Sequence, residues 1–507
     1  MTTPPPREPG YLGEGGRLTG GPAPELVASG YAQEISHGPR LAAAMSWADT
    51  AHAVALAEGG GIDAPTAAAL LGGLAELDAI PDDRFPWDAA RGDAFNSREA
   101  ELTRRVGKAA AGWLSAGRPR RESFRVAVRL VARAQAVELH DALVESAAAF
   151  VALAGRHRDA LAADYTYLQP AQPTTAGHLM LAYAYPALRD AARIRGVHAE
   201  LARSVAGAGG SAGSRWPLDR VRLAELLGCD GIVLHAKDAA WQADVYVDLL
   251  GAVATAFAHA SQMAQDFEIF ASREFGIVEL ADAHSRASAL MPQKRNPYAL
   301  AVIRAMAGTA AGELSGLLVA LHTGTARTDH FHVVNGAVPR VMDEAVAVAR
   351  LAARVVEGMR VDVDRMATVA REGFVVAADL ADVVAMRCGV DYRTAHHIVG
   401  RAVREATDAG RSPDALGPAD IAAAAAAVGV EGLDVPADIA EVLDPATCAR
   451  ERLQPGSSSP EAMAQMLEDC AARIGRARAW AEAARAREAA GLRARDDAVR
   501  RLRATGG

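Results

Sequence analysis

Apolar residues recur at heptad spacing through a segment from Glu122 to Ala154 that contains neither glycine nor proline. The residues that follow one another at this interval are Leu130, Val137, Val144 and Val151. The pattern predicts a helix on the order of 50 Å long. A helix of that length outruns any single small core, so it must pack against other long helices.

Further segments with few breaks predict those partners. They run from Leu218 to Phe275 with a turn near Gly228, from Tyr298 to His322, and from Val341 to Arg371. Together they predict an all-α protein with an elongated central bundle of long helices. We expect three domains: residues 1–118 as a small helical domain, 119–373 as the bundle, and 374–507 as a C-terminal helical domain.

Composition agrees with close helix packing and argues against two classes of partner. The 507 residues are half apolar with few aromatics, and alanine is frequent throughout, which favours helices packed on small side chains. The net charge is −8, and there is no basic run, so we expect no nucleic-acid partner. We find no signal peptide and no stretch that is long and uncharged enough to span a bilayer. We therefore expect a cytoplasmic protein without membrane contact, and the four scattered cysteines are typical of reduced thiols.

The residues best suited to catalysis are concentrated in a loop at 284–297. Its core reads Ser288-Ala-Leu-Met-Pro-Gln-Lys-Arg-Asn-Pro297. Lys294 supplies a compact positive charge, and Asn296 supplies an amide that can donate to the same oxygen atoms. These groups suit a carboxylate next to a carbon that loses a proton, and Ser288 is the candidate base in a pocket that excludes water. The alternative is a surface loop with exposed charges.

This loop resembles the signature of the fumarase/aspartase superfamily, Gly-Ser-Ser-x-Met-Pro-x-Lys-x-Asn-Pro, and its Met-Pro-Gln-Lys-Arg-Asn-Pro run is similar to that of the argininosuccinate lyase branch. Ser288 falls on the catalytic serine of the family, whereas Ala287 and Ala289 replace its glycine and second serine. The resemblance implies the three-domain fold of the superfamily and a homotetramer whose active sites are shared between subunits. It also places Met291 with the substrate-binding residues.

A second segment that resembles the branch is Gly117-Arg-Pro-Arg-Arg-Glu122. The family version, Gly-Arg-Ser-Arg-Asn-Asp, holds the succinyl part of the substrate. Arg118 and Arg120 are kept, while Pro119 and Arg121 replace the serine and asparagine. Arginine is a better bidentate clamp for an anion than asparagine, so we expect a carboxylate to bind here in a different pose, with all three arginines as substrate-binding residues. The alternative is an arginine-rich helix start exposed to solvent.

A third segment, from Tyr165 to His178, resembles the Thr-His-Leu-Gln motif of the family. Thr166 and Gln169 fall on its threonine and glutamine, and the resemblance assigns them to substrate binding. The family histidine, part of the acid/base system, is replaced by Tyr167. With an ordinary pKa of about 10, a tyrosine can donate a proton to a departing group more readily than it can shuttle one both ways. The alternative is a ring that only packs.

His330 and His332 fall near the place where argininosuccinate lyases carry a Tyr-Asn-Arg-Asp run that binds the arginine end of the substrate. That run is not recognisable here. The alternate spacing of the two histidines would suit a metal on a strand, but no third ligand is apparent, so we expect no metal. The loss of the run favours a nitrogen substituent other than that of argininosuccinate.

These residues predict a carbon–nitrogen lyase that acts on a dicarboxylate-type small molecule, an N-substituted aspartate. It would remove a proton from Cβ, expel the nitrogen and release fumarate. We expect no cofactor, because the substrate's own carboxylate carries the charge of the carbanion. Argininosuccinate is the default substrate by resemblance. Two alternatives stay open: a family member that runs a cyclisation or a different elimination, and an inactive homologue with a structural role.

Overall fold

Helix α7 (Arg120–Arg156) is the rod around which the other long helices are arranged. The computed structural model describes residues 21–81, 83–439 and 444–506. The heptad positions Leu130, Val137 and Val144 are buried, as their spacing predicts. The predicted helix is confirmed, and it extends slightly beyond both predicted ends because neither Arg120 nor Gly155 interrupts the hydrogen-bonding pattern.

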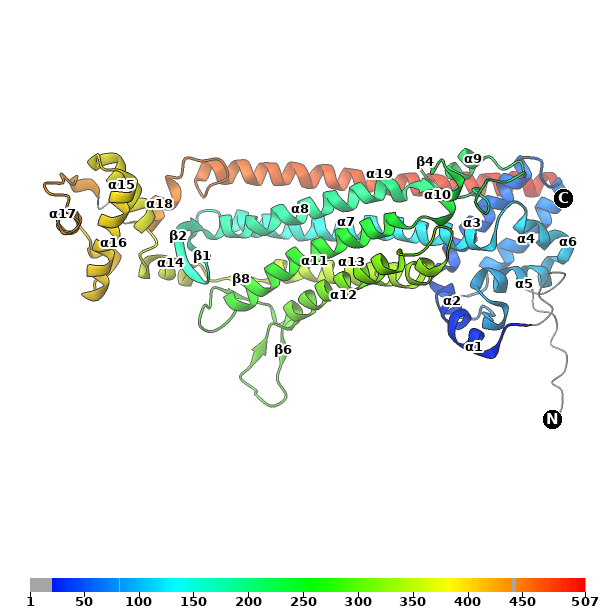
Figure 1. The fold of residues 1–507 in the computed structure, drawn as a ribbon, viewed down its shortest axis with the longest axis horizontal. Helices are drawn as coiled ribbons and strands as arrows, with labels where there is room; N and C mark the ends of the chain where they lie inside the picture. The colour runs from blue at the N-terminus through cyan, green and yellow to red at the C-terminus, as the bar shows by residue number, and fades with distance from the viewer. Residues whose placement is uncertain (1–20, 82, 440–443, 507) are drawn as a thin grey trace.

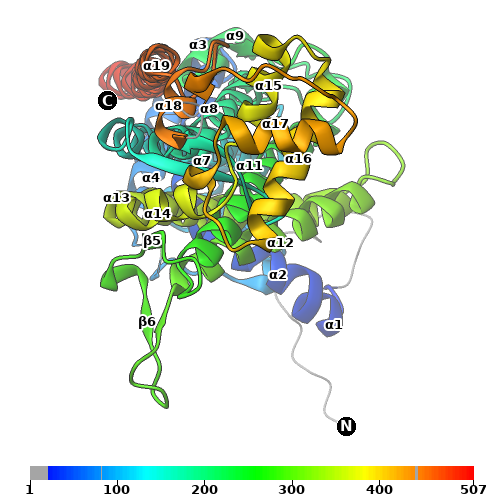
Figure 2. The ribbon, with the colours of Figure 1, turned by 90° about the vertical axis from the view of Figure 1, so that its left-hand side faces the viewer.

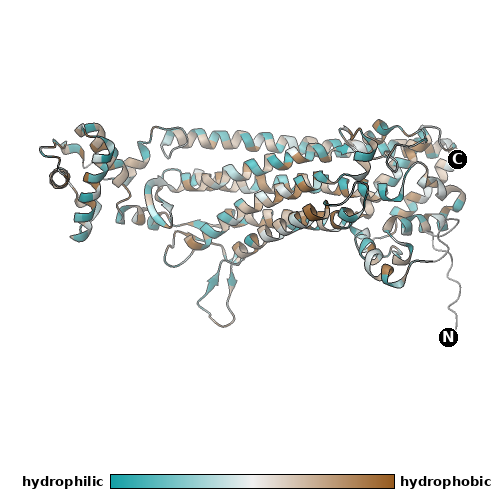
Figure 3. Cartoon of the chain, in the orientation of Figure 1, coloured by the Kyte–Doolittle hydropathy of each residue, from teal (hydrophilic) through white to brown (hydrophobic). Residues whose placement is uncertain are grey.

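Other long helices lie beside α7 and form an elongated bundle (Figure 1). They are α8 (Ala176–Leu201), α11 (Asp244–Phe270), α12 (Tyr298–Ala320), α13 (Asp329–Gly358) and α19 (Pro460–Gly506). Apolar and polar stretches alternate along each of them (Figure 3), and their inward residues join one large core. The mostly α class and its central long-helix bundle are therefore confirmed.

Two of the predicted rods are shorter than expected. The segment that begins at Leu218 forms α9 (Arg220–Leu226), β4 (Gly231–Ile232) and α10 (Ala236–Trp241) before α11 starts. Gly228, with φ of 61°, takes the left-handed conformation that ends α9, and Gly231, with φ of 155°, begins β4.

The rod expected from Val341 to Arg371 is also divided. Helix α13 begins earlier, carries Pro339 within it, and ends at Gly358. The chain then forms β8 (Arg360–Val361) and α14 (Val363–Glu372), where the Asp362 carboxylate caps the first turn by accepting from the Arg365 N–H.

Strands within the described residues pair only in two-stranded ladders. Three ladders are antiparallel and one is parallel. They are β1 (Leu161–Thr166) with β2 (Gln169–Thr175), β5 (Val278–Glu279) with β8, β6 (Arg286–Ala287) with β7 (Arg295–Asn296), and β3 (Arg203–Ser204) with β4. Two of these ladders present the site segments described below.

Short helices cover one end of the bundle (Figure 1). They are α1 (Pro24–Leu26), η1 (Val27–Tyr31), α2 (Ala32–Ser36), α3 (Gly38–Glu58), α4 (Ala64–Asp78), η2 (Ala89–Arg91), α5 (Ala94–Val106), α6 (Lys108–Ala111) and η3 (Gly112–Ser115). Their buried residues belong to the same core as those of the rods. This group therefore packs continuously on the bundle.

The opposite end carries a small helical group with a core of its own (Figures 1 and 2). Its helices are α15 (Ala377–Cys388), α16 (Tyr392–Asp408), η5 (Pro413–Ala415), α17 (Pro418–Ala427) and α18 (Pro445–Arg450). Helix α19 then runs back along the bundle and packs on α7, α8 and α4. Residues 374–507 thus contribute to both the end group and the bundle, and the proposed three-domain boundaries stay a prediction.

Helix α12 corrects one expectation. By length and composition alone it is apolar enough to cross a membrane, whereas the sequence was expected to contain no such segment. In the single chain only 22% of its apolar window is buried, because it contacts α11 and α13 on one side. Its apolar composition leaves a face that the rest of this chain does not cover.

Candidate active site

The loop at 284–297 forms a β-hairpin that projects from the bundle (Figures 1 and 2). Arg286 pairs with Asn296 and Ala287 with Arg295, so residues 288–294 of the motif form the end of the hairpin. The Ser288 hydroxyl oxygen accepts from the backbone N–H of Leu290 at 3.3 Å and of Met291 at 3.0 Å. These two bonds fold the motif into a local turn that requires no other part of the chain.

The cations of the hairpin differ in their partners. Arg295 is anchored to the body by Glu279, by Asp282 at 2.8 Å and by the Leu280 carbonyl at 2.8 Å. Lys294 is exposed and, among the described residues, has no ion pair. The Asn296 amide donates to the Arg286 carbonyl at 2.9 Å, which holds it at the hairpin base. The lysine ammonium is thus available to a ligand while its neighbour positions the loop.

The second predicted segment is the turn between β1 and β2. Thr166 pairs with Gln169, and the two residues between them, Tyr167 and Leu168, have φ of 52° and 60°. This left-handed region is costly for residues with a side chain, by about 1 to 2 kcal/mol each. Tyr167 is 99% exposed, whereas Tyr165 packs against the Phe270 and Phe275 rings. The turn therefore presents the Tyr167 hydroxyl away from its own chain.

The third segment, at the N-terminal end of α7, is built into the core. The Arg118 guanidinium is buried and donates to the Asp49 carboxylate at 2.5 Å, which also accepts from Arg98 at 3.1 Å and from the Ser123 hydroxyl at 2.9 Å. Arg120 forms an ion pair with the buried Asp93 carboxylate. Two of the three arginines expected to bind substrate thus already have carboxylate partners in their own chain.

Arg121, the third, is half-buried and has no ion pair within the described part of the chain. Burial, with a smaller contribution from Arg120, lowers the pKa of its guanidinium. It lines a small pocket together with Arg125 and with His332 and Asn335 of α13. Sequence reasoning missed Arg125, although its position four residues after Arg121 places both on one face of the helix.

The two histidines considered for a metal lie on α13, not on a strand. His330 Nε2 lies 3.1 Å from the Trp241 carbonyl, and His332 Nδ1 lies 3.7 Å from the Glu34 carboxylate. Among the described residues, no group of three or more His, Cys, Asp or Glu side chains is placed to hold a metal ion. The pair therefore belongs to helix packing and to the pocket beside Arg121.

A single chain does not bring the three segments together. Arg120 begins α7, and the Tyr167 turn follows its other end, so the 37 residues of the helix, about 55 Å, separate them. The Ser288 hairpin leaves the bundle at a third place (Figure 1). Any site that combines these side chains must therefore draw on more than one copy of the chain.

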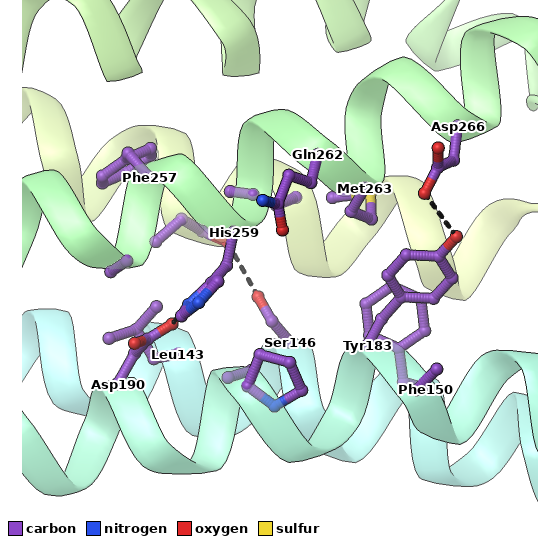
Figure 4. Close-up of a pocket in the computed structure, with 17 residues that line it drawn as sticks. Leu143, Ser146, Phe150, Tyr183, Asp190, Phe257, His259, Gln262, Met263 and Asp266 are labelled. Atoms are coloured by element: carbon purple, nitrogen blue, oxygen red, sulfur yellow. Dashed lines mark hydrogen bonds and ion pairs between the residues drawn. The ribbon is translucent and has the colours of Figure 1, made fainter. Parts of the chain in front are cut away.

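The bundle also encloses a cavity of about 150 Å³ between α7, α8, α11 and α13 (Figure 4). Two pairs of its polar groups contact each other: His259 Nδ1 lies 2.8 Å from the Asp190 carboxylate, and the Tyr183 hydroxyl donates to Asp266 at 2.8 Å. Burial raises the pKa of Asp190, against the opposing effect of His259. None of the sequence-predicted site residues lines this cavity.

Solved structures share this architecture. The crystal structure of EDDS lyase in complex with formate superposes with a TM-score of 0.85 at 28% identity, covering 96% of this chain and 97% of that one. A class II fumarase from Schistosoma mansoni has a TM-score of 0.66 at 13% identity, covering 82% and 90%, which shows the fold alone. These likenesses define a lyase fold of the fumarase/aspartase type.

Sequence comparison identifies the family to which the chain belongs within this fold class. The family model described as Lyase matches residues 20–312, and the one described as Argininosuccinate lyase C-terminal matches residues 374–450. The argininosuccinate lyase of Frankia casuarinae is 32% identical over 469 residues, which cover 92% of this chain and 99% of that protein. The chain belongs to this lyase family as an argininosuccinate lyase-like member, and it is a carbon–nitrogen lyase.

Proposed function

We propose that this lyase eliminates an amine from an N-substituted aspartate and releases fumarate. The observation that carries the proposal is the hairpin in which Ser288, Lys294 and Asn296 occur together and project from the bundle. The family match supports the reaction class, and an EDDS lyase variant has been solved with bound fumarate. The substrate is a small molecule with at least two carboxylates.

In this mechanism Ser288 takes a proton from Cβ of the substrate. The electron pair left behind is delocalised into the adjacent carboxylate, whose second negative charge Lys294 and Asn296 stabilise. Met291 lies beside them in the same turn. Serine acts as a base only where water is excluded, so the exposed hairpin must close against another surface before the reaction.

The C–N bond then breaks, the carbon–carbon double bond of fumarate forms, and the departing nitrogen takes a proton from Tyr167. Thr166 and Gln169, which flank that turn, orient the substrate. Arg120 and Arg121 bind its carboxylates, and Arg118 acts through Asp49 by fixing the start of α7. The electron pair of the broken C–H bond moves only within the substrate and no net oxidation or reduction occurs, so the proposal requires no cofactor.

The functional unit of the proposal is a homotetramer whose sites are shared between subunits, as the family resemblance implies. Two observations support assembly: the separation of the three site segments in one chain, and the uncovered apolar face of α12. Burying that face against another copy would remove it from water. The cytoplasmic location expected from the sequence stays part of the proposal.

We further propose that the physiological substrate is not argininosuccinate. Arg121 stands where the branch has a neutral asparagine, and Tyr167 stands where it has a histidine. The segment around His332 also lacks the run that binds the arginine end in the branch. A second cation at the anion-binding segment favours a more acidic substrate than one with a guanidinium.

Fumarate release, followed by ultraviolet absorbance, tests the reaction. We expect the wild type to release fumarate from an N-substituted aspartate faster than from argininosuccinate. Ser288→Ala should reduce release by roughly 100- to 10,000-fold, the range for loss of a general base. Ser285→Ala is the matched control, because within the described parts of the chain the Ser285 hydroxyl bonds only to the Ala281 carbonyl. Efficient argininosuccinate cleavage would overturn the substrate assignment, and an active Ser288→Ala would overturn the mechanism.

A further inference from the structure

The cavity between α7, α8, α11 and α13 exists because small side chains meet inside the bundle. Three of these four helices contribute alanines to its wall. They are Ala182 and Ala187 of α8, Ala256 and Ala260 of α11, and Ala349 and Ala352 of α13. Protein interiors are normally packed without voids of this kind, and these side chains are too short to fill the space between the helices.

The size and the wall of the cavity suit a small molecule with a hydrocarbon body. Its volume is about 150 Å³, and Leu143, Phe150 and Phe257 add to the apolar wall. An apolar cavity of that size holds a benzene-sized molecule, and leaving it unfilled would destabilise the fold. Ala182 and Gln262 line the cavity and are exposed, which gives a ligand an entry between α8 and α11.

The two ends of the cavity are polar but differ in charge (Figure 4). At one end, the buried Asp190 carboxylate is paired with Arg193 and lies 2.8 Å from His259 Nδ1. At the other end, Asp266 Oδ2 accepts from the Tyr183 hydroxyl at 2.8 Å. Among the described residues Asp266 has no ion pair. Its charge is therefore uncompensated, whereas that of Asp190 is compensated.

Further groups make the Tyr183 end attractive to a cation. Burial, and then the charges of Asp266 and Asp164, raise the pKa of the Tyr183 hydroxyl, which keeps it protonated as a donor to Asp266. The rings of Phe150 and Tyr183 stack with their centres 5.4 Å apart, and aromatic faces carry partial negative charge. Within the described chain, no lysine or arginine lines the cavity.

We propose that this cavity binds a small organic ammonium ion. Its apolar body fills the space between the alanines, and its N–H groups donate to Asp266, whose Oδ1 is left available by the bond from Tyr183 to Oδ2. None of the catalytic segments lines the cavity, so this site is separate from the lyase site. The inference goes beyond the proposed function and does not depend on it.

Calorimetric binding to the full-length wild type, in the assembly in which it is purified, tests the site. The probes are benzylammonium, benzyl alcohol, benzoate and ethylammonium. We expect benzylammonium to bind most tightly and benzyl alcohol roughly 10-fold more weakly, because a hydrogen bond to a charged group is lost. Benzoate should not bind, since its charge repels that of Asp266. Ethylammonium should bind more weakly than benzylammonium, because it buries less apolar surface.

Three variants locate the ligand. Asp266→Asn removes the charge but keeps an acceptor for the Tyr183 hydroxyl, so it should weaken benzylammonium roughly 10-fold and leave benzyl alcohol unchanged. Asp248→Asn removes an exposed carboxylate about 27 Å away along the same helix and should change nothing. Ala260→Leu fills the cavity and should abolish binding of both benzyl compounds.

Thermal unfolding checks that the variants are folded. Benzylammonium should raise the melting temperature of the wild type and leave that of Ala260→Leu unchanged, because a ligand stabilises only the state that binds it. Asp266→Asn without ligand should melt at the wild-type temperature or above it, since an unpaired charge is removed.

Three results would overturn the proposal. If benzylammonium does not bind the wild type, the cavity is closed by another copy of the chain or is filled by water. If benzyl alcohol binds as tightly as benzylammonium and Asp266→Asn changes neither affinity, the cavity selects apolar molecules and not cations. Undiminished binding to folded Ala260→Leu would place the ligand elsewhere on the protein.

Discussion

The Ser288 hairpin and the N-terminal end of α7 both carry cationic residues of the proposed site. They differ in how far these side chains are buried and in whether they have partners. In the hairpin, Lys294 is exposed, and among the described residues the Ser288 hydroxyl bonds only within its own turn. At the start of α7, Arg118 is buried against Asp49 and Arg120 is paired with Asp93. Arg118 and Arg120 thus have their partners within the chain, whereas Lys294 of the hairpin is exposed to a ligand or to another molecule.

The largest expected effect tests whether the hairpin completes its site against another copy of this chain. We expect Ser288→Ala and Arg121→Ala each to retain less than about 1% of activity. Co-expressed, they should regain a measurable fraction, because a hairpin and an α7 end that are both intact can then meet from different subunits. Fumarate release by the purified mixture measures the gain.

The control mixes two variants of the same hairpin, Ser288→Ala and Lys294→Ala. Neither subunit then supplies an intact hairpin, so this mixture should stay inactive. If both mixtures regained the same activity, the active sites would not be shared between subunits. The difference proposed between the hairpin and the start of α7 would then be wrong.

The next effect concerns stability at the α7 end. Asp49→Ala leaves the buried guanidinium of Arg118 without its carboxylate and leaves that of Arg98 with only the more distant Asp78, at 3.8 Å, which should cost about 3 to 5 kcal/mol of unfolding free energy. Asp282→Ala removes the 95% exposed partner of Arg295 at the hairpin and should cost less than about 1 kcal/mol. Denaturant unfolding of both variants measures the difference, and similar losses would show that the two regions are not distinct.

A smaller effect is expected at the turn of β1 and β2. Replacing Tyr167 and Leu168 together by Asn and Gly relieves two left-handed residues and should raise the free energy of local opening by about 1 to 2 kcal/mol. Hydrogen exchange of the strand amides measures this gain. Tyr167→Phe keeps the strained backbone and removes only the hydroxyl, so it should leave exchange unchanged and lower activity. Full activity in both variants would exclude Tyr167 as the proton donor.

The smallest effect is a pH dependence at the buried end. Burial, and then Arg118, lowers the pKa of His52 well below 6.5, so the folded state keeps this ring neutral while the unfolded state takes up a proton. Stability is therefore complete above pH 6.5 and falls as the pH drops below it, by at most about 1.4 kcal/mol for each pH unit from this group. His52→Gln, which can still donate to the Ala116 carbonyl, should show a shallower loss in unfolding experiments between pH 7 and pH 5. An unchanged slope would assign the acid sensitivity to other groups.

Much of the fold could be predicted from local features of the sequence. The absence of glycine and proline from 122–154 and its heptad of apolar residues predicted α7, because helix formation and one-sided burial depend on neighbours three to seven positions away. Pro339 misled the prediction for α13, since a proline inside a helix is tolerated where surrounding packing compensates. The apolar composition of α12 is visible in the sequence, but it was not recognised there that this helix is long and apolar enough to span a membrane.

The sequence by itself determined which chemical groups the protein carries: the serine, lysine and asparagine of the hairpin, the tyrosine in place of a histidine, and the added Arg121. Tertiary structure alone decided which of them have partners. Asp49 and Arg118 are 69 positions apart, and the rings that enclose Arg125 come from Trp241 and Phe331. Charge pairing and burial depend on contacts between distant segments, which no local pattern encodes, so only the folded chain separates the buried Arg118 from the exposed Lys294.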